Sequence, residues 1–478
     1  MIFSLLNFGL NFSSQNHHTS EFSTLNDEES TIAGNESQLV IALLPWGDLF
    51  EDFFDTVGVS VETFQNEFIG SYQFAYINAL KHAGIRTILF FVSARISEPL
   101  RFIHKPTNTP VCILPASRSY RWYKSLQNNA LIAGGVKKDQ KFSDVYNSSS
   151  VYSSVLTTAK NVVKSFGSYL SIPIFDLAIE MRRERCKVIL CQEYDYPRFD
   201  IAVLMGKLLS LPVFATFQGG ENPQNFLEYP ARSLTLKMCD GFIIASKVET
   251  QRVRNQYGIP IAKIARVFNP VDLSVWQIED RKIARDILGI PQTDRIVVYH
   301  GRIEIHRKGL DVLLDAWKQL EKHDTDGNLR LLLIGTGGDD EKLRQLIQEL
   351  GLHRVMWVNE FINDRTVMQR YLSAADLYTL PSRHEGFPIA PLEAMACKLP
   401  VVAADAPGIA DIFEYGELSG GVVVPCGDAG ALASAINRVL DDDALRDQLS
   451  QSSYSRVREC FSLETVGPQL RNFLFNDV

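Results

Sequence analysis

Short apolar runs alternate with helical patterns along nearly the whole chain. The run LVIALLP at 39–45 is followed by an amphipathic stretch at 71–84 that ends in glycine, and then by a second apolar run at 85–93. Continuous apolar strands separated by helices are typical of a parallel sheet that helices cover on both faces. The same pattern predicts a helix near 200–210 and further strands at 187–192, 211–218 and 241–246.

A second series of the same kind begins at 295–302, after a polar, proline-containing interruption at 269–280. It predicts a helix at 311–320 and strands near 329–337, 355–360, 376–382, 400–405 and 420–425. The fold class is therefore α/β, with two Rossmann-like doubly wound domains. Such sheets bind ligands at the carboxyl ends of their strands, which predicts a cleft between the two domains.

The predicted boundaries follow these two series. A Ser-, Thr-, Asn- and Glu-rich stretch makes residues 1–38 a disordered tail, and the two domains span 39–272 and 273–455. The segment 456–478 carries a terminal amphipathic helix signal at 461–474.

Composition narrows the class of protein. The 478 residues carry a net charge of −8, which argues against nucleic acid as a partner. No apolar run approaches the roughly 18 residues that cross a bilayer, and the apolar opening lacks the basic start and cleavage site of a signal peptide. Seven cysteines without a C-x-x-C pair fit a reducing compartment, so we expect a cytoplasmic protein.

One segment departs from the acidic average. Residues 81–141 contain eleven Lys or Arg against two acids, and they include SRSYRWYK at 117–124, where cations interleave with aromatic rings. We weigh two interpretations: a solvated loop, or a patch that docks on anionic lipid headgroups at the inner membrane surface.

The motif EGFPIAPLE at 385–393 holds two glutamates around a predicted helix start. Pro388 fits the first turn, where the amides of Ile389 and Ala390 would form an anion site. Glu385 and Glu393 would flank a bound diphosphate, and each carboxylate suits a vicinal diol, one on a sugar and one on a ribose. The alternative is that Glu385 caps the helix and Glu393 is an exposed helix residue.

A loop of cations follows the strand at 295–302. The stretch HGRIEIHRKGLD contains Gly301, Arg302 and Lys308. Cations at the mouth of a sheet can clamp a diphosphate and neutralise the charge that builds on a leaving group. The alternative is an ordinary basic strand–helix loop.

These motifs, in this order with the terminal helix signal, resemble those of the retaining glycosyltransferases of the GT-B fold, the "glycosyl transferases group 1" (family 4). The resemblance is specific over 290–475 and looser over 39–270. It implies that the terminal helix crosses back to the first domain, and that the enzyme uses no cofactor and no metal, with a nucleotide diphosphate sugar as co-substrate.

The resemblance also assigns roles. Arg302, Lys308 and Glu385 form the catalytic set, with the cations on the diphosphate and Glu385 on the hydroxyls of the donor sugar. Glu393 holds the ribose and the base lies near 355–360. The remaining donor-binding residues are Gly301, Gly386, Phe387, Ile389, Ala390 and, in the first domain, Gly70.

The first domain departs from the family pattern. Only Gly70 and Ser71 stand where a glycine-rich loop usually follows the first strand, and Gln218 occupies a slot where many members carry histidine. A glutamine can bond a sugar hydroxyl but cannot act as a base. We expect Gln218, Gly219 and the strand-end acids Glu193 and Asp195 on the acceptor side, the alternative being that the two acids are solvent-exposed.

The resulting interpretation is a retaining glycosyltransferase that moves a sugar to an acceptor hydroxyl on a sugar or glycolipid, lipid-linked or polysaccharide. Two enzyme alternatives share the scaffold: a nucleotide-sugar epimerase, and a phosphorylase, for which no lysine in a pyridoxal context is identified. A non-enzyme alternative is a nucleotide-sugar-binding protein that has lost transfer.

Overall fold

A computed structural model describes residues 38–45, 47, 49–70, 72–124, 167–219 and 228–475. Residues Leu39–Val478 form one unit, separate from Met1–Gln38. The predicted tail, apart from Gln38, and the end of the basic segment at 125–141 lie outside the described residues.

The first half of the unit is built on a largely parallel sheet in the order β3-β4-β2-β1-β5-β6-β7-β8, in which only β3 runs antiparallel to its neighbour. The strands of this sheet include five that continuous apolar runs predicted and three, β3, β4 and β8, that were not predicted. In chain order, the strands are β1 (Leu39–Leu44), β2 (Ile85–Ser93), β3 (Leu100–His104), β4 (Thr109–Pro115), β5 (Val188–Gln192), β6 (Val213–Thr216), β7 (Gly241–Ile243) and β8 (Ile264–Ala265).

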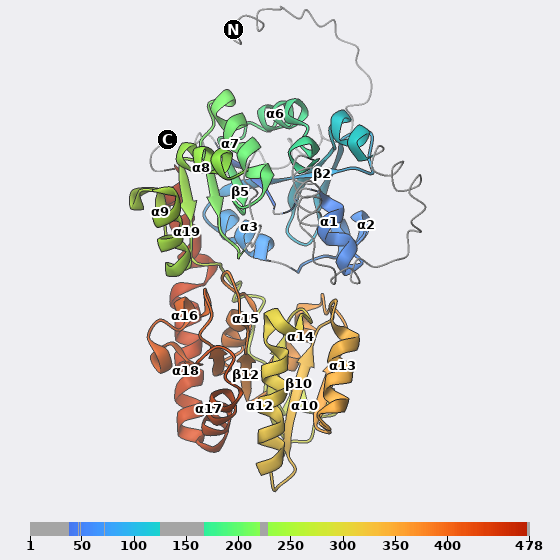
Figure 1. Ribbon diagram of the computed structural model, residues 1–478, viewed down its shortest axis with the longest axis vertical. Coiled ribbons are helices and arrows are strands. Elements are labelled where there is room, and N and C mark those ends of the chain that lie inside the picture. The colour runs from blue at the N-terminus through green and yellow to red at the C-terminus, as the bar shows by residue number, and fades with distance from the viewer. Residues whose placement is uncertain are drawn as a thin grey trace, which may run out of the picture. The chain divides into compact units, whose positions relative to one another are not determined.

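Helices cover both faces of this sheet, because alternate residues of a strand point to opposite sides. Val40 and Ala42 of β1 join the core beneath α6, α7 and α8, whereas Ile41 and Leu43 join the core beneath α1, α2 and α3 (Figure 1). The helices are α1 (Phe50–Phe54), η2 (Asp55–Val57), α2 (Val61–Asn66), α3 (Tyr72–His82), α6 (Ile174–Arg183), α7 (Pro197–Leu209), α8 (Glu228–Met238), α9 (Lys247–Tyr257) and η3 (Ile261–Lys263).

The second half is a fully parallel sheet in the order β11-β10-β9-β12-β13-β14. This order places the topological switch point between β9 and β12, where open α/β sheets bind ligands. The strands are β9 (Arg295–His300), β10 (Leu329–Ile334), β11 (Val355–Val358), β12 (Leu377–Leu380), β13 (Val401–Ala404) and β14 (Gly421–Val424).

One continuous apolar core joins this second sheet to its helices. The helices are α10 (Arg281–Leu288), α11 (Ile305–Lys308), α12 (Leu310–His323), α13 (Asp340–Glu349), α14 (Arg365–Ala374), α15 (Ala390–Ala396), α16 (Ile409–Ile412), η4 (Gly416–Ser419), α17 (Ala429–Asp441) and α18 (Asp443–Cys460).

The last helix, α19 (Leu463–Phe475), packs on α3 of the first half, as the resemblance implied. Its buried residues Val466, Leu470 and Leu474 enter the same core as α3, and Arg471 Nη1 donates to the carbonyl oxygen of Ala83 at 2.7 Å. A Cβ on Gly467 would lie 2.6 Å from the carbonyl oxygen of Ala79, so glycine permits this close approach.

Three elements differ from the sequence prediction. The antiparallel hairpin of β3 and β4 occupies residues of the basic segment, for which a solvated loop was one of two interpretations; the edge strand β3 has only a weak apolar pattern. The helices α1 and α2 precede α3 in a stretch for which the sequence predicted no helix or strand. The helix that holds Glu393 begins at Ala390 rather than at Pro388, with Pro391 in its first turn.

Candidate active site

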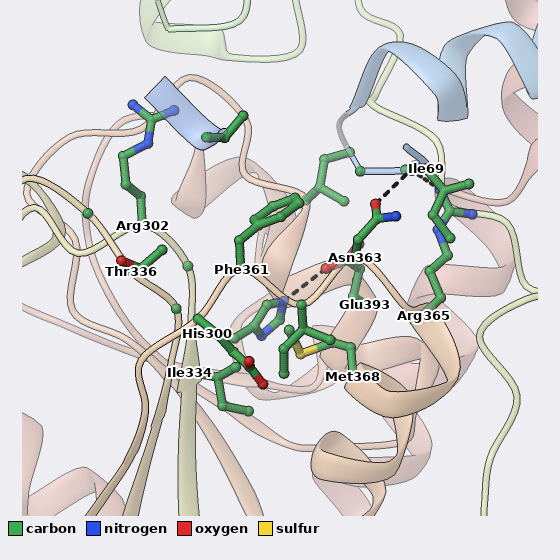
Figure 2. A pocket seen from close by; sticks show the side chains of 18 of the residues that line it. Ile69, His300, Arg302, Ile334, Thr336, Phe361, Asn363, Arg365, Met368 and Glu393 are labelled. Atoms are coloured by element: carbon green, nitrogen blue, oxygen red, sulfur yellow. Dashed lines mark hydrogen bonds and ion pairs between the residues drawn. The ribbon is translucent and has the colours of Figure 1, made fainter. Parts of the chain in front are cut away.

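A cavity of about 910 Å³ lies at the carboxyl ends of β9, β10 and β11. Its walls include His300, Gly301 and Arg302 after β9, the glycine-rich turn 334–338 after β10, and Ile389 and Glu393 around α15. Ile69 and Gly70 of the first half complete one side (Figure 2). Five residues that were predicted to bind the donor therefore line one cavity at the switch point: Gly70, Gly301, Arg302, Ile389 and Glu393.

Lys308 and Glu385 form an ion pair next to this cavity, although neither lines it. Lys308 Nζ donates to Glu385 Oε1 at 2.7 Å, and Ser382 Oγ donates to the same oxygen at 2.7 Å. The side chain of Glu385 is 7% exposed and that of Lys308 is 20% exposed. The pair joins the ends of α11 and β12, so it fixes the loop after one strand to the loop after its neighbour.

The local backbone explains why these two residues meet. Gly309 ends α11 in the left-handed conformation, with φ of 64°. A Cβ there would lie 2.0 Å from the carbonyl oxygen of Pro381, so only glycine allows the two loops to touch. The N-cap of α15 is Ile389, without a side-chain cap, and the alternative that Glu385 caps this helix is wrong.

Glu393 pairs with a histidine that the sequence analysis did not single out. His300 Nε2 and Glu393 Oε2 lie 2.9 Å apart, and Figure 2 shows both side chains meeting in the cavity. His300 is 6% exposed, and its Nδ1 has no hydrogen-bond partner. Glu393 is half-buried, so the alternative of an exposed helix glutamate is also wrong. The signal was present: His300 is a polar residue at the end of an apolar strand, directly before Gly301.

Arg302 takes a different direction from the His300–Glu393 pair (Figure 2). Its Nη1 donates to Glu304 Oε1 at 2.9 Å, and its side chain is 49% exposed. A half-exposed pair of this kind holds its partners weakly, so Arg302 can exchange Glu304 for an incoming anion.

The glycines of the donor loop allow three backbone segments to converge. A Cβ on Gly386 would lie 2.3 Å from the amide nitrogen of Gly219, and a Cβ on Gly408 would lie 1.9 Å from the carbonyl oxygen of Gly386. Gly219 also accepts a hydrogen bond from Arg307 Nη2 at 3.4 Å through its carbonyl oxygen. Gly386 and Gly219, predicted on opposite substrates, are thus in contact.

Phe387 and Gln218 lie where these three backbone segments converge. The Phe387 ring is buried and stacks on Phe268, with centroids 5.2 Å apart, and it does not line the cavity. Gln218 and Asn269 exchange amide hydrogen bonds of 2.8 and 3.1 Å, and Asn269 Nδ2 also donates to the carbonyl oxygen of Phe387 at 2.9 Å. The side-chain amide of Gln218 is therefore committed to the link between the two halves.

The strand-end acids of the first half are buried, so the alternative that they are solvent-exposed is wrong. Glu193 is 2% exposed and holds φ of 81°, and its carboxylate accepts from the amides of Tyr194 at 3.0 Å and Gln218 at 3.1 Å. Burial raises the pKa of Asp195 to about 6, against the opposing charge of Arg252. Neither acid is among the residues that line the cavity.

Gly70 lies where the first half meets the loop after β11. Ile69 donates its amide to Asn363 Oδ1 at 3.0 Å, and Arg365 Nη2 donates to the carbonyl oxygen of Ile69 at 2.8 Å (Figure 2). A Cβ on Gly70 would lie 2.9 Å from Cζ of Phe361. The sequence analysis missed Phe361, Asn363 and Arg365, because contacts between residues this far apart leave no periodic signal.

Three further features concern the chain as far as the structure describes it. Within the described ranges, no cluster of three or more His, Cys, Asp or Glu could hold a metal ion. Nor does any helix in those ranges have both the length and the apolarity needed to cross a membrane. All seven cysteines are free thiols.

Residues 280–456 match the family model described as "Glycosyl transferases group 1". The matched segment contains β9, β12 and α15 together with Arg302, Lys308, Glu385 and Glu393. It covers the second sheet and the ion pairs at its switch point.

Among curated relatives, the chain is similar to "D-inositol 3-phosphate glycosyltransferase" of a Nocardioides species, at 29% identity over 52% of this chain and 56% of the relative. It is 34% identical to "Lipopolysaccharide core biosynthesis glycosyltransferase LpsD" of Rhizobium meliloti over 38% of this chain and 50% of the relative. The chain spans about half the length of the curated relatives it matches.

Solved structures share the fold over more of the chain. Sucrose-phosphate synthase from Thermosynechococcus elongatus superposes with a TM-score of 0.62 at 21% identity, covering 92% of this chain and 100% of that one. HepE from Anabaena in complex with UDP-glucose gives a TM-score of 0.63 at 16% identity, with the same coverage. The architecture is the GT-B fold.

Proposed function

Through residues 280–456 the chain belongs to the glycosyl transferases group 1 family, and on that premise we propose that it is a retaining glycosyltransferase. It moves a sugar from a nucleotide diphosphate sugar to an acceptor hydroxyl, without a metal or a bound cofactor. The observation that carries the proposal is two paired carboxylates at the switch point: Glu393 with His300 in the cavity, and Glu385 with Lys308 at the neighbouring loops.

The donor lies across this switch point. Glu393 holds the ribose, and the base lies against the loop 360–362 on the cavity wall. Glu385 accepts hydrogen bonds from hydroxyls of the donor sugar, while the amides of Ile389 and Ala390 face the diphosphate. Arg302 leaves Glu304 to pair with the diphosphate, because a doubly charged phosphate attracts a guanidinium more strongly than one half-exposed carboxylate.

Transfer then follows from stabilising the leaving group. The bond between the anomeric carbon and the diphosphate oxygen breaks, and the acceptor oxygen bonds to the anomeric carbon on the same face. Gln218 cannot take the acceptor proton, so the proton passes to the leaving diphosphate oxygen. Lys308 and Arg302 neutralise the charge that builds there, which is the largest contribution to catalysis in sites of this kind.

Calorimetry with a panel of UDP-, GDP- and ADP-linked sugars tests the donor site. We expect the wild type to bind one donor class and Glu385→Ala to lose most of that affinity. Glu341→Ala is the matched control, because Glu341 is an exposed glutamate of the same half in a surface ion pair with Arg344. Failure of every donor to bind the wild type would contradict the proposal.

The alternatives predict different products. An epimerase converts the nucleotide sugar without an acceptor and releases no nucleoside diphosphate. A protein that has lost transfer binds the donor but leaves it intact. Release of nucleoside diphosphate that depends on an added acceptor therefore distinguishes transfer from both.

We also propose that the chain works in the cytoplasm and touches the inner membrane surface through the described part of the segment 81–141. Arg86, Arg95 and Arg101 of this segment pair with acids outside it. We place the membrane contact at the helical turn at 118–124, where the Trp122 side chain is 67% exposed among Arg118, Arg121 and Lys124.

A further inference from the structure

The chain between β1 and α3 builds a wall of the cavity. Residues 45–70, which we call the β1–α3 segment, contain α1, η2 and α2. Phe53, Thr56, Val57 and Gly58 of this segment line the same cavity as Arg302 and Glu304. The segment leaves the sheet at the carboxyl end of β1, so the fold places it beside the site.

Aromatic packing holds the segment in place. Phe54 packs edge-to-face on Phe64 with ring centroids 4.9 Å apart, and Phe50 packs on Phe91 of β2 at 5.3 Å. Phe50, Phe54 and Phe64 are all buried. Such rings interdigitate with fixed geometry, so the segment is a formed surface rather than a loose loop.

Three acids of the segment, Glu51, Asp52 and Asp55, have partners outside the cavity. Glu51 accepts from Ser93 Oγ and from the amide of Arg95, and Asp55 pairs with the Arg95 guanidinium. Asp52 accepts the amide of Leu49 at 3.0 Å. None of these three carboxylates lines the cavity.

The described residues of the segment that line the cavity are uncharged, and all but Thr56 have apolar side chains or none. The ring of Phe53 and the methyl groups of Val57 are half-buried there, and the Thr56 hydroxyl donates to the carbonyl oxygen of Phe53 at 2.6 Å. A sugar needs hydrogen-bond partners for its hydroxyls, whereas a hydrocarbon chain needs only apolar area. Arg302 and Glu304 add charged groups elsewhere on the lining of the cavity.

We propose that this wall of the β1–α3 segment binds a linear hydrocarbon chain attached to the acceptor sugar, so that the acceptor is a glycolipid. The inference rests on the proposed transfer function and names the class of its acceptor. A cavity of about 910 Å³ is at the upper end of the roughly 300–1,000 Å³ of ligand pockets, which suits two substrates better than a donor alone.

The test is calorimetric binding of octyl β-glucoside, below its micellar concentration, against methyl β-glucoside, each in the presence of UDP. We expect the octyl glycoside to bind at least about tenfold more tightly, since each buried methylene favours binding. Val57→Asn should reduce the preference for the octyl glycoside at least about threefold, because the hydrocarbon chain would strip the asparagine amide of its hydrogen bonds to water.

Val61→Asn is the matched control. Val61 is also a half-buried valine of the same segment but does not line the cavity. Equal binding of the two glycosides, binding of neither, or an equal effect of both substitutions would overturn the inference. None of these results bears on the donor panel, which tests the transfer function separately.

Discussion

The Nζ atom of Lys308 lies 2.7 Å from Oε1 of Glu385, and this contact joins the loop after β9 to the loop after β12. Both loops sit at the point where the strand order of the second sheet reverses. The pair therefore holds the two sides of the proposed donor site together before any donor arrives.

Removing one member of this pair should destabilise the protein. Lys308→Met leaves the carboxylate of Glu385 buried without its cation, and we expect the free energy of unfolding in urea to fall by about 3 kcal/mol. The double variant Lys308→Met/Glu385→Leu should regain most of this loss, because it buries no unpaired charge. Additive effects of the two single changes would show that the pair is not coupled.

His300 should act on the donor through Glu393. His300→Phe removes the hydrogen bond to Glu393 Oε2, and we expect about tenfold weaker UDP binding, since hydrogen bonds to charged groups contribute about 1.5–3 kcal/mol.

His300→Gln keeps a donor at this position and should restore most of the affinity. In steady-state kinetics the change should appear in the KM for the donor more than in kcat. Equal UDP affinity of His300→Phe and the wild type would rule out a positioning role.

Gly386 should tolerate no larger residue. The Cβ of Gly386→Ala would lie 2.3 Å from backbone atoms of Gln218 and Gly219, so one loop must move. We expect a loss of about 2 kcal/mol in thermal unfolding, as for other overpacked sites. Gly430→Ala is the control, because its Cβ meets only Asp428 Oδ1, at 3.4 Å, and should change stability by less than about 0.5 kcal/mol.

Asp195 should make the stability depend on pH. Burial raises its pKa in the folded protein from 3.8 to about 6, so between these values the folded state binds more protons than the unfolded state. The contribution of Asp195 to the free energy of unfolding is therefore fully present below pH 4. It falls by up to about 3 kcal/mol as the pH rises to about 6.

The check is urea unfolding of the wild type and Asp195→Asn at pH 4, 5, 6 and 7. The free energy of unfolding of Asp195→Asn relative to that of the wild type should rise from pH 4 to about pH 6 and then stay level to pH 7. A constant difference at all four values would mean that Asp195 does not titrate there.

Membrane contact should depend on the turn at 118–124. Reversing Arg118, Arg121 and Lys124 to Glu should abolish pelleting with anionic liposomes, because cations near an anionic membrane surface each contribute about 1 kcal/mol to binding. Donor hydrolysis should stay unchanged. Reversing the exposed Lys282, Lys318 and Lys322 of the second half is the control and should leave pelleting intact. Equal pelleting by all three proteins would argue against this surface.

Much of the fold was predictable because buried parallel strands have a strong local signature. The apolar runs located β1, β2, β5, β9 and β12, and Glu393 of EGFPIAPLE lines the cavity. The predictions that failed concerned residues whose environment is set by distant partners, such as the hairpin of β3 and β4, which lies at a sheet edge.

The amino-acid sequence by itself determined the two doubly wound sheets and the spacing of Glu385 and Glu393, since periodicity and motif spacing are local properties. Only the tertiary structure decided that His300 contacts Glu393, that Glu193 is buried and accepts hydrogen bonds from backbone amides, and that the β1–α3 segment forms one wall of the cavity. Each of these depends on which strand ends lie side by side, and strand order is a property of the folded chain rather than of any single segment.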